Sequence, residues 1–140
     1  MTIQQVSVFV ENKVGSLTQL INLFAENDVN LQAISIAETQ EYGIVRLIVK
    51  DTEKATALLK KEGWVHTVTD VLAVNIANEP GALAKVLDVL VQAGVGVEYA
   101  YSFLARESGR VHMVLRVTDN AKAEPAFAQA DIVMIDQAGL

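Results

Sequence analysis

Two short segments of this sequence combine an asparagine with a glycine in a way that suits the binding of a small zwitterion. Asn12 lies three residues before Gly15, and Asn78 lies three residues before Gly81. A glycine lets the backbone turn sharply and approach a ligand closely. The side-chain amide of asparagine can both donate and accept hydrogen bonds. An α-amino acid needs both, because it carries an ammonium and a carboxylate group.

Each glycine precedes a segment with the apolar spacing of an amphipathic helix. Apolar residues at i, i+3, i+4 and i+7 are Leu17, Leu20, Ile21 and Phe24 in the first segment, and Leu83, Val86, Leu87 and Leu90 in the second. The first turn of a helix presents unpaired N–H groups and the positive end of the helix dipole. A carboxylate is therefore a natural ligand at both places.

The two segments belong to a repeat that runs through the chain. An offset of 66 relates residues 6–17 to 72–83, residues 27–31 to 93–97, and Tyr42-Gly43 to Ser108-Gly109. Beyond this turn Val49 matches Val117 at an offset of 68, which indicates a two-residue insertion in the second repeat. We expect two domains, residues 1–68 and 69–140.

Each repeat has the pattern strand, helix, strand, strand, helix, strand. A unit of this kind, with about 65 residues, normally forms a four-stranded antiparallel sheet with two helices on one face, the ferredoxin-like α+β plan. Asp51-Thr52 offers an N-cap for the second helix, whereas Pro125 predicts a late start or a loosened first turn in the corresponding helix of the second repeat. Residues 65–77 join the repeats with no Gly-, Pro- or Ser-rich linker.

The helix-free faces of the sheets are expected to need cover, because Phe9, Ile48 and Val114 point there. A second apolar feature is the alternation of Tyr99, Tyr101 and Phe103, where the first repeat has small residues. It predicts packing in a core or interface, or the wall of an apolar ligand pocket. Arg46 and His112 are predicted to share one repeat position on the helix-free face.

The composition excludes several classes of chemistry. The 140 residues include no cysteine, which rules out disulfides, thiolate metal sites and cysteine nucleophiles. A net charge of −6 without a basic cluster argues against a nucleic-acid partner, and no apolar run approaches the ~20 residues that span a bilayer. His66 and His112 have no carboxylate at ligand spacing, and no nucleophile or phosphate-loop motif occurs. We expect a non-enzyme without metal or cofactor and, since no signal-peptide pattern opens the chain, a cytoplasmic one.

The residues around the two glycines resemble a known family. Glu11-Asn12-Lys13-Val14-Gly15-Ser16-Leu17 and Ala77-Asn78-Glu79-Pro80-Gly81-Ala82-Leu83, each followed by an apolar helix, are similar to the ACT domain. That family consists of small ligand-sensing domains, often regulatory parts of amino-acid metabolic enzymes, that bind amino acids between two domains. The resemblance covers nearly the whole chain twice, and implies a free-standing tandem ACT protein.

The resemblance also implies where a ligand binds. In amino-acid-binding ACT domains, an asparagine at the position of Asn30 closes the pocket from the neighbouring domain. The implied ligand-binding residues are Asn12, Val14, Gly15, Ser16 and Leu17 in the first loop, Asn30, Leu31 and Gln32 at the second strand, and Asn78, Glu79, Pro80, Gly81, Ala82 and Leu83 in the second loop. Each glycine and asparagine also has a purely structural explanation, as a turn or cap residue.

Two pockets arise if the repeats pair edge to edge through their second strands. One combines residues 78–83 with 30–32 and has two amides, whereas the other combines residues 12–17 with 96–98 and has Gly96 in place of the second amide. We favour the first pocket. Some serine-sensing relatives have a histidine where this chain has Val10 and Ile76, so serine is not implied.

We therefore expect an amino-acid-binding regulatory or sensor protein that forms a homodimer through sheet faces or edges. Two alternatives remain open. The first is a structural assembly module whose pockets no longer bind a ligand. The second is a regulatory subunit of an amino-acid metabolic enzyme, which adds an enzyme partner.

Overall fold

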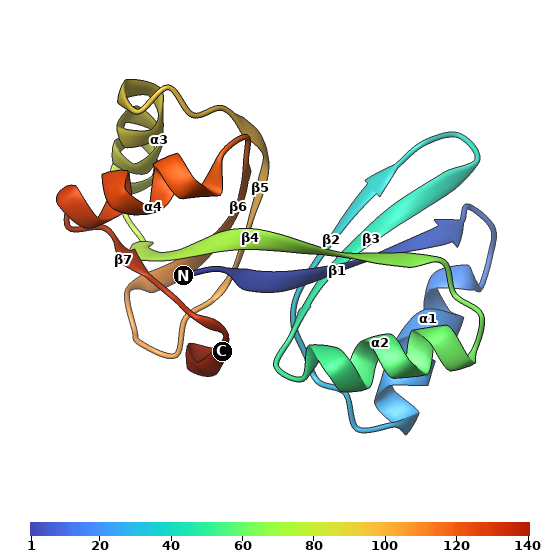
Figure 1. Cartoon of the computed structure of the whole chain (residues 1–140). Coiled ribbons are helices and arrows are strands. Elements are labelled where there is room, and N and C mark those ends of the chain that lie inside the picture. Colours follow the sequence, from blue (N-terminus) through green and yellow to red (C-terminus); the bar gives the residue numbers. More distant parts are fainter. The chain divides into compact units, whose positions relative to one another are not determined.

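The chain folds into four α-helices and seven strands, as the computed structural model of all 140 residues shows (Figure 1). In chain order the elements are β1 (Ile3–Glu11), α1 (Ser16–Glu26), β2 (Leu31–Glu38), β3 (Tyr42–Val49), α2 (Thr52–Lys61), β4 (His66–Ala77), α3 (Ala82–Gln92), β5 (Val97–Leu104), β6 (Arg110–Val117), α4 (Asn120–Gln129) and β7 (Val133–Met134), followed by a short 3-10 helix, η1 (Gln137–Gly139). The longest helices have 11 residues, and none has the length and hydropathy to cross a bilayer.

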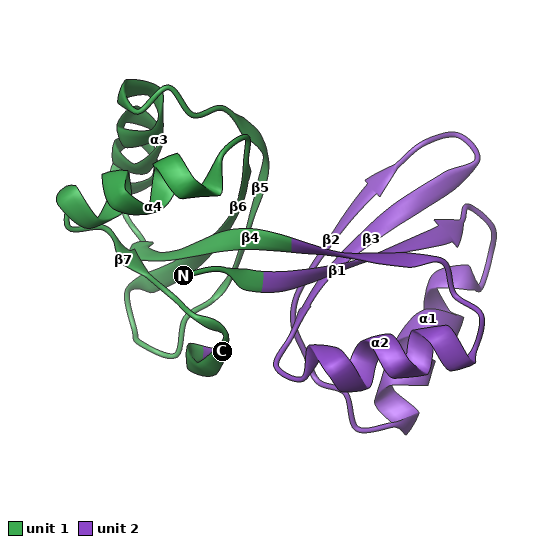
Figure 2. Ribbon diagram, viewed as in Figure 1, with its two compact units in different colours: residues 1–3, 70–139 green, residues 4–69, 140 purple.

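The chain forms two compact units (Figure 2). The N-terminal unit comprises residues 4–69 and 140, and the C-terminal unit comprises residues 1–3 and 70–139. Strand β4 is unbroken over 12 residues and supplies residues 66–69 to the first unit and residues 70–77 to the second. The predicted continuation of one repeat into the next without a linker is confirmed.

The N-terminal unit has the strand order β4-β1-β3-β2, in which β3 runs antiparallel to both of its neighbours. Its core joins one face of the sheet to Leu20 and Phe24 of α1 and to Ala55 and Leu59 of α2, all at most 1% exposed. Burying each large apolar side chain contributes about 1.5–3 kcal/mol. Both helices consequently pack on the same face of the sheet.

The C-terminal unit repeats this arrangement with the strand order β7-β4-β6-β5. Val86 and Leu90 of α3 and Ala123 and Phe127 of α4 pack against the apolar sheet face. The predicted α+β fold of two ferredoxin-like units, with the helices of each on one side of its sheet, is confirmed.

The second helix of each unit begins at an aspartate cap. Asp51 accepts a hydrogen bond from the backbone N–H of Lys54 at 3.0 Å, and Asp119 accepts one from Lys122 at 3.1 Å. The late or loosened start predicted for the helix around Pro125 is wrong. Helix α4 begins at Asn120 with Pro125 as its sixth residue, and its first turn is closed by the bond from Ala123 N–H to the Asp119 carbonyl. The cap and the buried Phe127 outweigh the single backbone donor that proline removes.

The strand register places the two-residue insertion earlier than predicted. Val6 opposes Leu47 in β3, and Leu72 opposes Leu115 in β6, so the first strands are related by 66 residues and the third strands by 68. The insertion therefore lies in the loop before the third strand, residues 39–41 in one unit and 105–109 in the other.

This register corrects the correspondences predicted for Tyr42, Arg46 and His112. Tyr42 corresponds to Arg110, Ile44 to His112, and Arg46 to Val114. The prediction that Arg46 and His112 share a repeat position was wrong. Both residues still lie on the helix-free faces, because they oppose Ser7 and Asn75, which alternate with core residues of β1 and β4.

The helix-free faces carry the apolar residues that the alternation predicted. Ile48 and Val114 are fully buried, whereas Phe9 is 36% exposed. Tyr99, Tyr101 and Phe103 oppose Arg116, Val114 and His112, which places this aromatic row on the helix-free face.

Candidate functional site

Each predicted loop glycine adopts a backbone conformation that other residues rarely take. Gly15 has φ 90° and Gly81 has φ 89°, both in the left-handed region, immediately before α1 and α3. Neither helix has a side-chain cap or an acidic residue in its first turn. The first N–H of each helix donates to a loop carbonyl, Ser16 to Lys13 at 3.3 Å and Ala82 to Glu79 at 3.4 Å. The remaining first-turn amides lack the acceptor that a capping side chain normally supplies, and they carry positive partial charge.

The two loop asparagines are held in position by backbone hydrogen bonds. The backbone N–H of Asn12 donates to the Glu41 carbonyl at 3.1 Å, and that of Asn78 donates to the Gly109 carbonyl at 2.9 Å. Each loop is thus tied to the hairpin of its own unit. The side chains of Asn12, Asn30 and Asn78 are exposed, so their amides are available to a ligand or partner.

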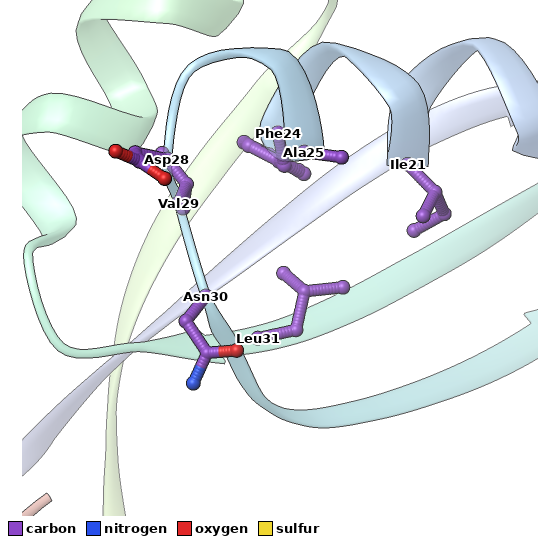
Figure 3. A pocket seen from close by; sticks show the side chains of 7 residues that line it. All are labelled: Ile21, Phe24, Ala25, Asp28, Val29, Asn30 and Leu31. Atoms are coloured by element: carbon purple, nitrogen blue, oxygen red, sulfur yellow. The ribbon is translucent and has the colours of Figure 1, made fainter.

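A groove of about 430 Å³ lies beside the end of α1 in the N-terminal unit (Figure 3). Ile21, Phe24 and Ala25 from α1 line one side, and Asn30 and Leu31 extend from the segment that enters β2. Asp28 and Val29 complete the lining. The groove combines apolar walls with one free amide, which suits a small ligand with an apolar part and a polar end.

The first loop opens on a smaller hollow of about 130 Å³ in the same unit. Asn12 and Leu17 line it together with Ile36 of β2 and Gly43 of β3. Val14 is fully exposed beside it, while Ser16 is only 5% exposed and belongs to the interior. The structure therefore brings Asn12 and Leu17 together and keeps Ser16 away from solvent.

The residues of the second loop lie at the surface of the C-terminal unit. Asn78, Pro80 and Gly81 are exposed, and Leu83 is half-buried. Glu79 and Ala82 line a cavity of about 220 Å³ within this unit. Gln32, in the other unit, is half-buried in β2 and is not among the residues lining the groove beside Asn30.

Sequence reasoning missed two aspartates beside these cavities. Asp28 (φ 58°) and Asp131 (φ 57°) are the two non-glycine residues with a positive φ. Asp28 lines the groove beside Asn30, and Asp131 lines the cavity in the C-terminal unit. A signal was present, because the equivalent positions of the other repeat are Gly94 and Gly63, both left-handed. A left-handed backbone costs an aspartate some free energy and costs a glycine none, so an aspartate at such a position is a candidate for a functional role.

The second strand of each unit is an edge strand. β2 pairs only with β3, and β5 pairs only with β6. On β2 the apolar side chains of Ile34 and Ile36 are 44% and 51% exposed, whereas the corresponding residues of β5 are the small Ala100 and Ser102. An edge with unpaired backbone groups and exposed apolar side chains is a surface suited to pairing with another strand.

Comparison with known proteins is consistent with this geometry. A family model described as an ACT domain pair matches residues 1–139. The crystal structure of protein BT0572 from Bacteroides thetaiotaomicron superposes with a TM-score of 0.93 at 36% identity, covering 99% of this chain and 95% of that one. The regulatory subunit of aspartate kinase from Thermus thermophilus shares the fold, with a TM-score of 0.64 at 17% identity and 91% of each chain covered.

Curated relatives match one half of the chain. The acetolactate synthase isozyme 3 small subunit of Escherichia coli strain K12 is 29% identical over 69 residues, which are 49% of this chain and 42% of that protein. The acetolactate synthase small subunit of Haemophilus influenzae is 29% identical over 68 residues, again 42% of its length. The matched stretch thus spans less than half of these relatives.

Proposed function

Because this chain belongs to the family of ACT domain pairs, we propose that it is a regulatory protein that binds a free amino acid between two ACT units. The role is regulatory rather than catalytic. The observation that carries the proposal is the groove beside Asn30, where an apolar wall meets an amide without a side-chain partner. The loop at Gly81 supplies the complementary half in this proposal, with first-turn amides of α3 that have no side-chain cap and with the exposed side chain of Asn78.

Ligand chemistry divides between these two halves. The carboxylate of an amino acid accepts hydrogen bonds from the first-turn amides of α3, where the helix dipole favours negative charge. Asn30 and Asn78 offer carbonyl oxygens to its ammonium group. The side chain of the amino acid occupies the apolar part of the groove, formed by Ile21, Phe24 and Leu31.

We further propose that a second copy of the chain supplies the second unit. The edge of β2 carries bulky Ile34 and Ile36, and the edge of β5 carries Ala100 and Ser102 at the same repeat positions. A β2 edge is therefore complementary in size to a β5 edge, while two β2 edges place large side chains opposite each other. A homodimer in which β2 of one copy meets β5 of the other follows from this asymmetry.

The names of the relatives support an enzyme partner. The curated relatives are small subunits of acetolactate synthase, and a structural relative is a regulatory subunit of aspartate kinase. We propose that this chain likewise regulates an enzyme of amino-acid metabolism. The bound amino acid changes the affinity of this chain for that enzyme. Such regulation requires the ligand to bind two states of the assembly with different affinity.

A thermal-shift screen of the twenty protein amino acids tests the proposal. A ligand that binds only the native state raises stability by mass action, by about 2.7 kcal/mol at one hundred times its dissociation constant. We expect one amino acid, or a small related group, to raise the melting temperature. Asn30→Ala should reduce this shift, whereas the control Asn22→Ala, on the exposed face of α1, should leave it unchanged.

A flat screen contradicts amino-acid binding and favours the second candidate, a structural assembly module. The exposed apolar edge of β2 also fits that role. Sedimentation of the chain without ligand tests the homodimer itself, which both candidates require.

A further inference from the structure

The C-terminal unit contains a cavity of about 220 Å³ that includes charged side chains of both signs. Glu79 comes from the β4–α3 loop, Lys85 from α3, Arg110 from the start of β6, and Asp131 from the connection between α4 and β7. The cavity is bounded by elements of one unit alone. Its volume is below the range of about 300–1,000 Å³ that suits drug-sized ligands, so it suits a smaller molecule.

Arg110 is held in place by Asn75 of the neighbouring strand. Its Nε donates to Asn75 Oδ1 at 3.0 Å, and its Nη2 donates to the Asn75 carbonyl at 2.8 Å. These bonds fix the planar guanidinium and leave its Nη1 group for another acceptor. An arginine oriented in this way can bind a carboxylate with little further loss of conformational freedom.

The N-terminal repeat has aromatic residues at the positions equivalent to Asn75 and Arg110. The residues equivalent to Asn75 and Arg110 are Phe9 and Tyr42, whose rings lie 6.3 Å apart. Trp64 corresponds to the smaller Ile132, because each donates the equivalent backbone bond to a carbonyl near the end of the preceding helix, Trp64 N–H to Leu59 and Ile132 N–H to Phe127. Three aromatic side chains of one repeat are thus replaced by two polar residues and a smaller apolar one.

Asp131 adds a carboxylate at a position where glycine is the unstrained choice. Its φ is 57°, and Gly63 has φ 76° at the equivalent position of the other repeat. Left-handed backbone costs a non-glycine residue roughly 1 kcal/mol, although aspartate tolerates it better than most. The aspartate brings negative charge to a cavity that already contains Arg110 and Lys85.

We propose that this cavity is a second binding site, for a small molecule that carries both a carboxylate and an ammonium group. Arg110 and Lys85 receive the carboxylate, and Asp131 and Glu79 receive the ammonium. The site differs from the one between two units, because it needs no second unit. The two sites share Glu79 and Ala82, but Asn78 and Gly81 do not line the cavity.

Titrations of the isotope-labelled full chain with each of the twenty protein amino acids, followed by backbone amide NMR, test the proposal. At least one amino acid should shift the amides of Arg110, Asp131 and Ile132 in a saturable manner. Acetate and methylammonium, which carry one charge each, should bind at least tenfold more weakly. If no amino acid shifts these amides, or acetate binds as tightly, the proposal is wrong.

Two arginine variants of β6 provide matched evidence. Arg110→Tyr introduces the residue of the other repeat and should weaken binding at least tenfold. Arg116→Ile removes an arginine that pairs with Glu98 at 3.2 Å outside the cavity and also introduces the other repeat's residue, Ile48. Binding should be unchanged in this control, and an equal loss in both variants overturns the assignment.

A third variant separates binding from folding. Asp131→Gly introduces the residue that the other repeat has at the equivalent turn, so the fold should be retained. Binding of the amino acid should fall at least tenfold. Unchanged binding by this variant contradicts the role of Asp131. Shifts at residues 28–31, Asn78 and Gly81 without any at Arg110, Asp131 and Ile132 overturn the second site and leave the site between two units intact.

Discussion

The imidazole ring of His112 meets the ring of Phe103 edge to face, with centroids 4.8 Å apart and planes inclined at 77°. The two residues oppose each other on β6 and β5, on the helix-free face of the C-terminal unit. The Nδ1 atom of His112 is buried without a hydrogen-bond partner. Burial lowers the pKa of His112 below its usual 6.5, the Glu107 carboxylate acts in the opposite direction, and the Arg110 guanidinium adds to the lowering.

The pH dependence of stability should therefore have a component from His112. Because the pKa is lower in the folded state, the unfolded chain binds more protons in the window just below pH 6.5. Stability is retained above this window and decreases as the pH falls through it. Urea denaturation of the chain at pH 7.5 and at successive steps below pH 6.5 measures the effect.

His112→Ile, which introduces the residue of the equivalent Ile44, should reduce this pH dependence. His66→Gln, the variant of the other histidine, gives the slope against which this change is compared. If the two variants change the slope equally, the component does not arise at His112.

Thr52→Val should stabilise the N-terminal unit. Thr52 is 7% exposed, and its hydroxyl is buried without a hydrogen-bond partner. Valine has nearly the same shape and removes this hydroxyl, which should raise the free energy of unfolding by about 1 kcal/mol. The Asp51 cap on Lys54 stays intact. Chemical denaturation gives the difference.

Thr56→Val is the matched control for this substitution. Its hydroxyl donates to the Thr52 carbonyl at 2.9 Å, so its removal should leave stability unchanged or lower it by a few tenths of a kcal/mol. A gain at Thr56 as large as that at Thr52 indicates a general effect of the methyl group rather than relief of an unpartnered hydroxyl.

Gly81→Val should destabilise the C-terminal unit through its backbone alone. A Cβ at Gly81 meets no atom within 4 Å, so no steric contact opposes the substitution. The φ of 89° is costly for any residue with a Cβ, particularly a β-branched one. We expect the free energy of unfolding to fall by about 1–3 kcal/mol for Gly81→Val and by about 1 kcal/mol for Gly81→Ala.

Gly43→Ala is the control for the glycine substitutions. Gly43 lies in β3 without a positive φ, and its added Cβ meets neighbours only at 3.8 Å or more. The alanine variant should be neutral or slightly more stable, because glycine is a poor strand residue. If Gly43→Ala costs as much as Gly81→Ala, the left-handed conformation is not the cause.

The fold could be predicted from the sequence because two independent signals agree in each repeat. In each repeat the first helix is defined by a glycine turn, at Gly15 or Gly81, and by the apolar stripe that follows it. Because both signals occur at matching positions in the two repeats, the assignment in one repeat supports the assignment in the other. The insertion was misplaced because Tyr42-Gly43 and Ser108-Gly109 look alike as turns, while only the pairing of core residues across strands fixes the register.

The candidate site was less accessible to sequence reasoning. Asn12 and Asn30, which line a hollow and a groove, could be named as candidates from their residue type and position, and their role in binding stays a prediction. The cavity around Arg110 could not, because it depends on a pair of residues, Asn75 and Arg110, that are far apart in the sequence and meet only through the register of β4 and β6. The start of α4 also depends on tertiary packing, since burial of Phe127 stabilises a helix that contains Pro125.

The two loop asparagines should contribute unequally to amino-acid binding. Asn78 belongs to the loop that we pair with the groove of Asn30, whereas our proposal pairs the loop of Asn12 with residues 96–98, where Gly96 stands in place of a second amide. Loss of one hydrogen bond to a charged group costs about 1.5–3 kcal/mol, or roughly tenfold to a hundredfold in affinity. Asn78→Ala should show such a loss and Asn12→Ala a much smaller one, measured by calorimetry with the amino acid that the thermal-shift screen selects. Both side chains are exposed, so neither variant should change the melting temperature without ligand. Equal losses in the two variants remove the preference for the loop of Gly81.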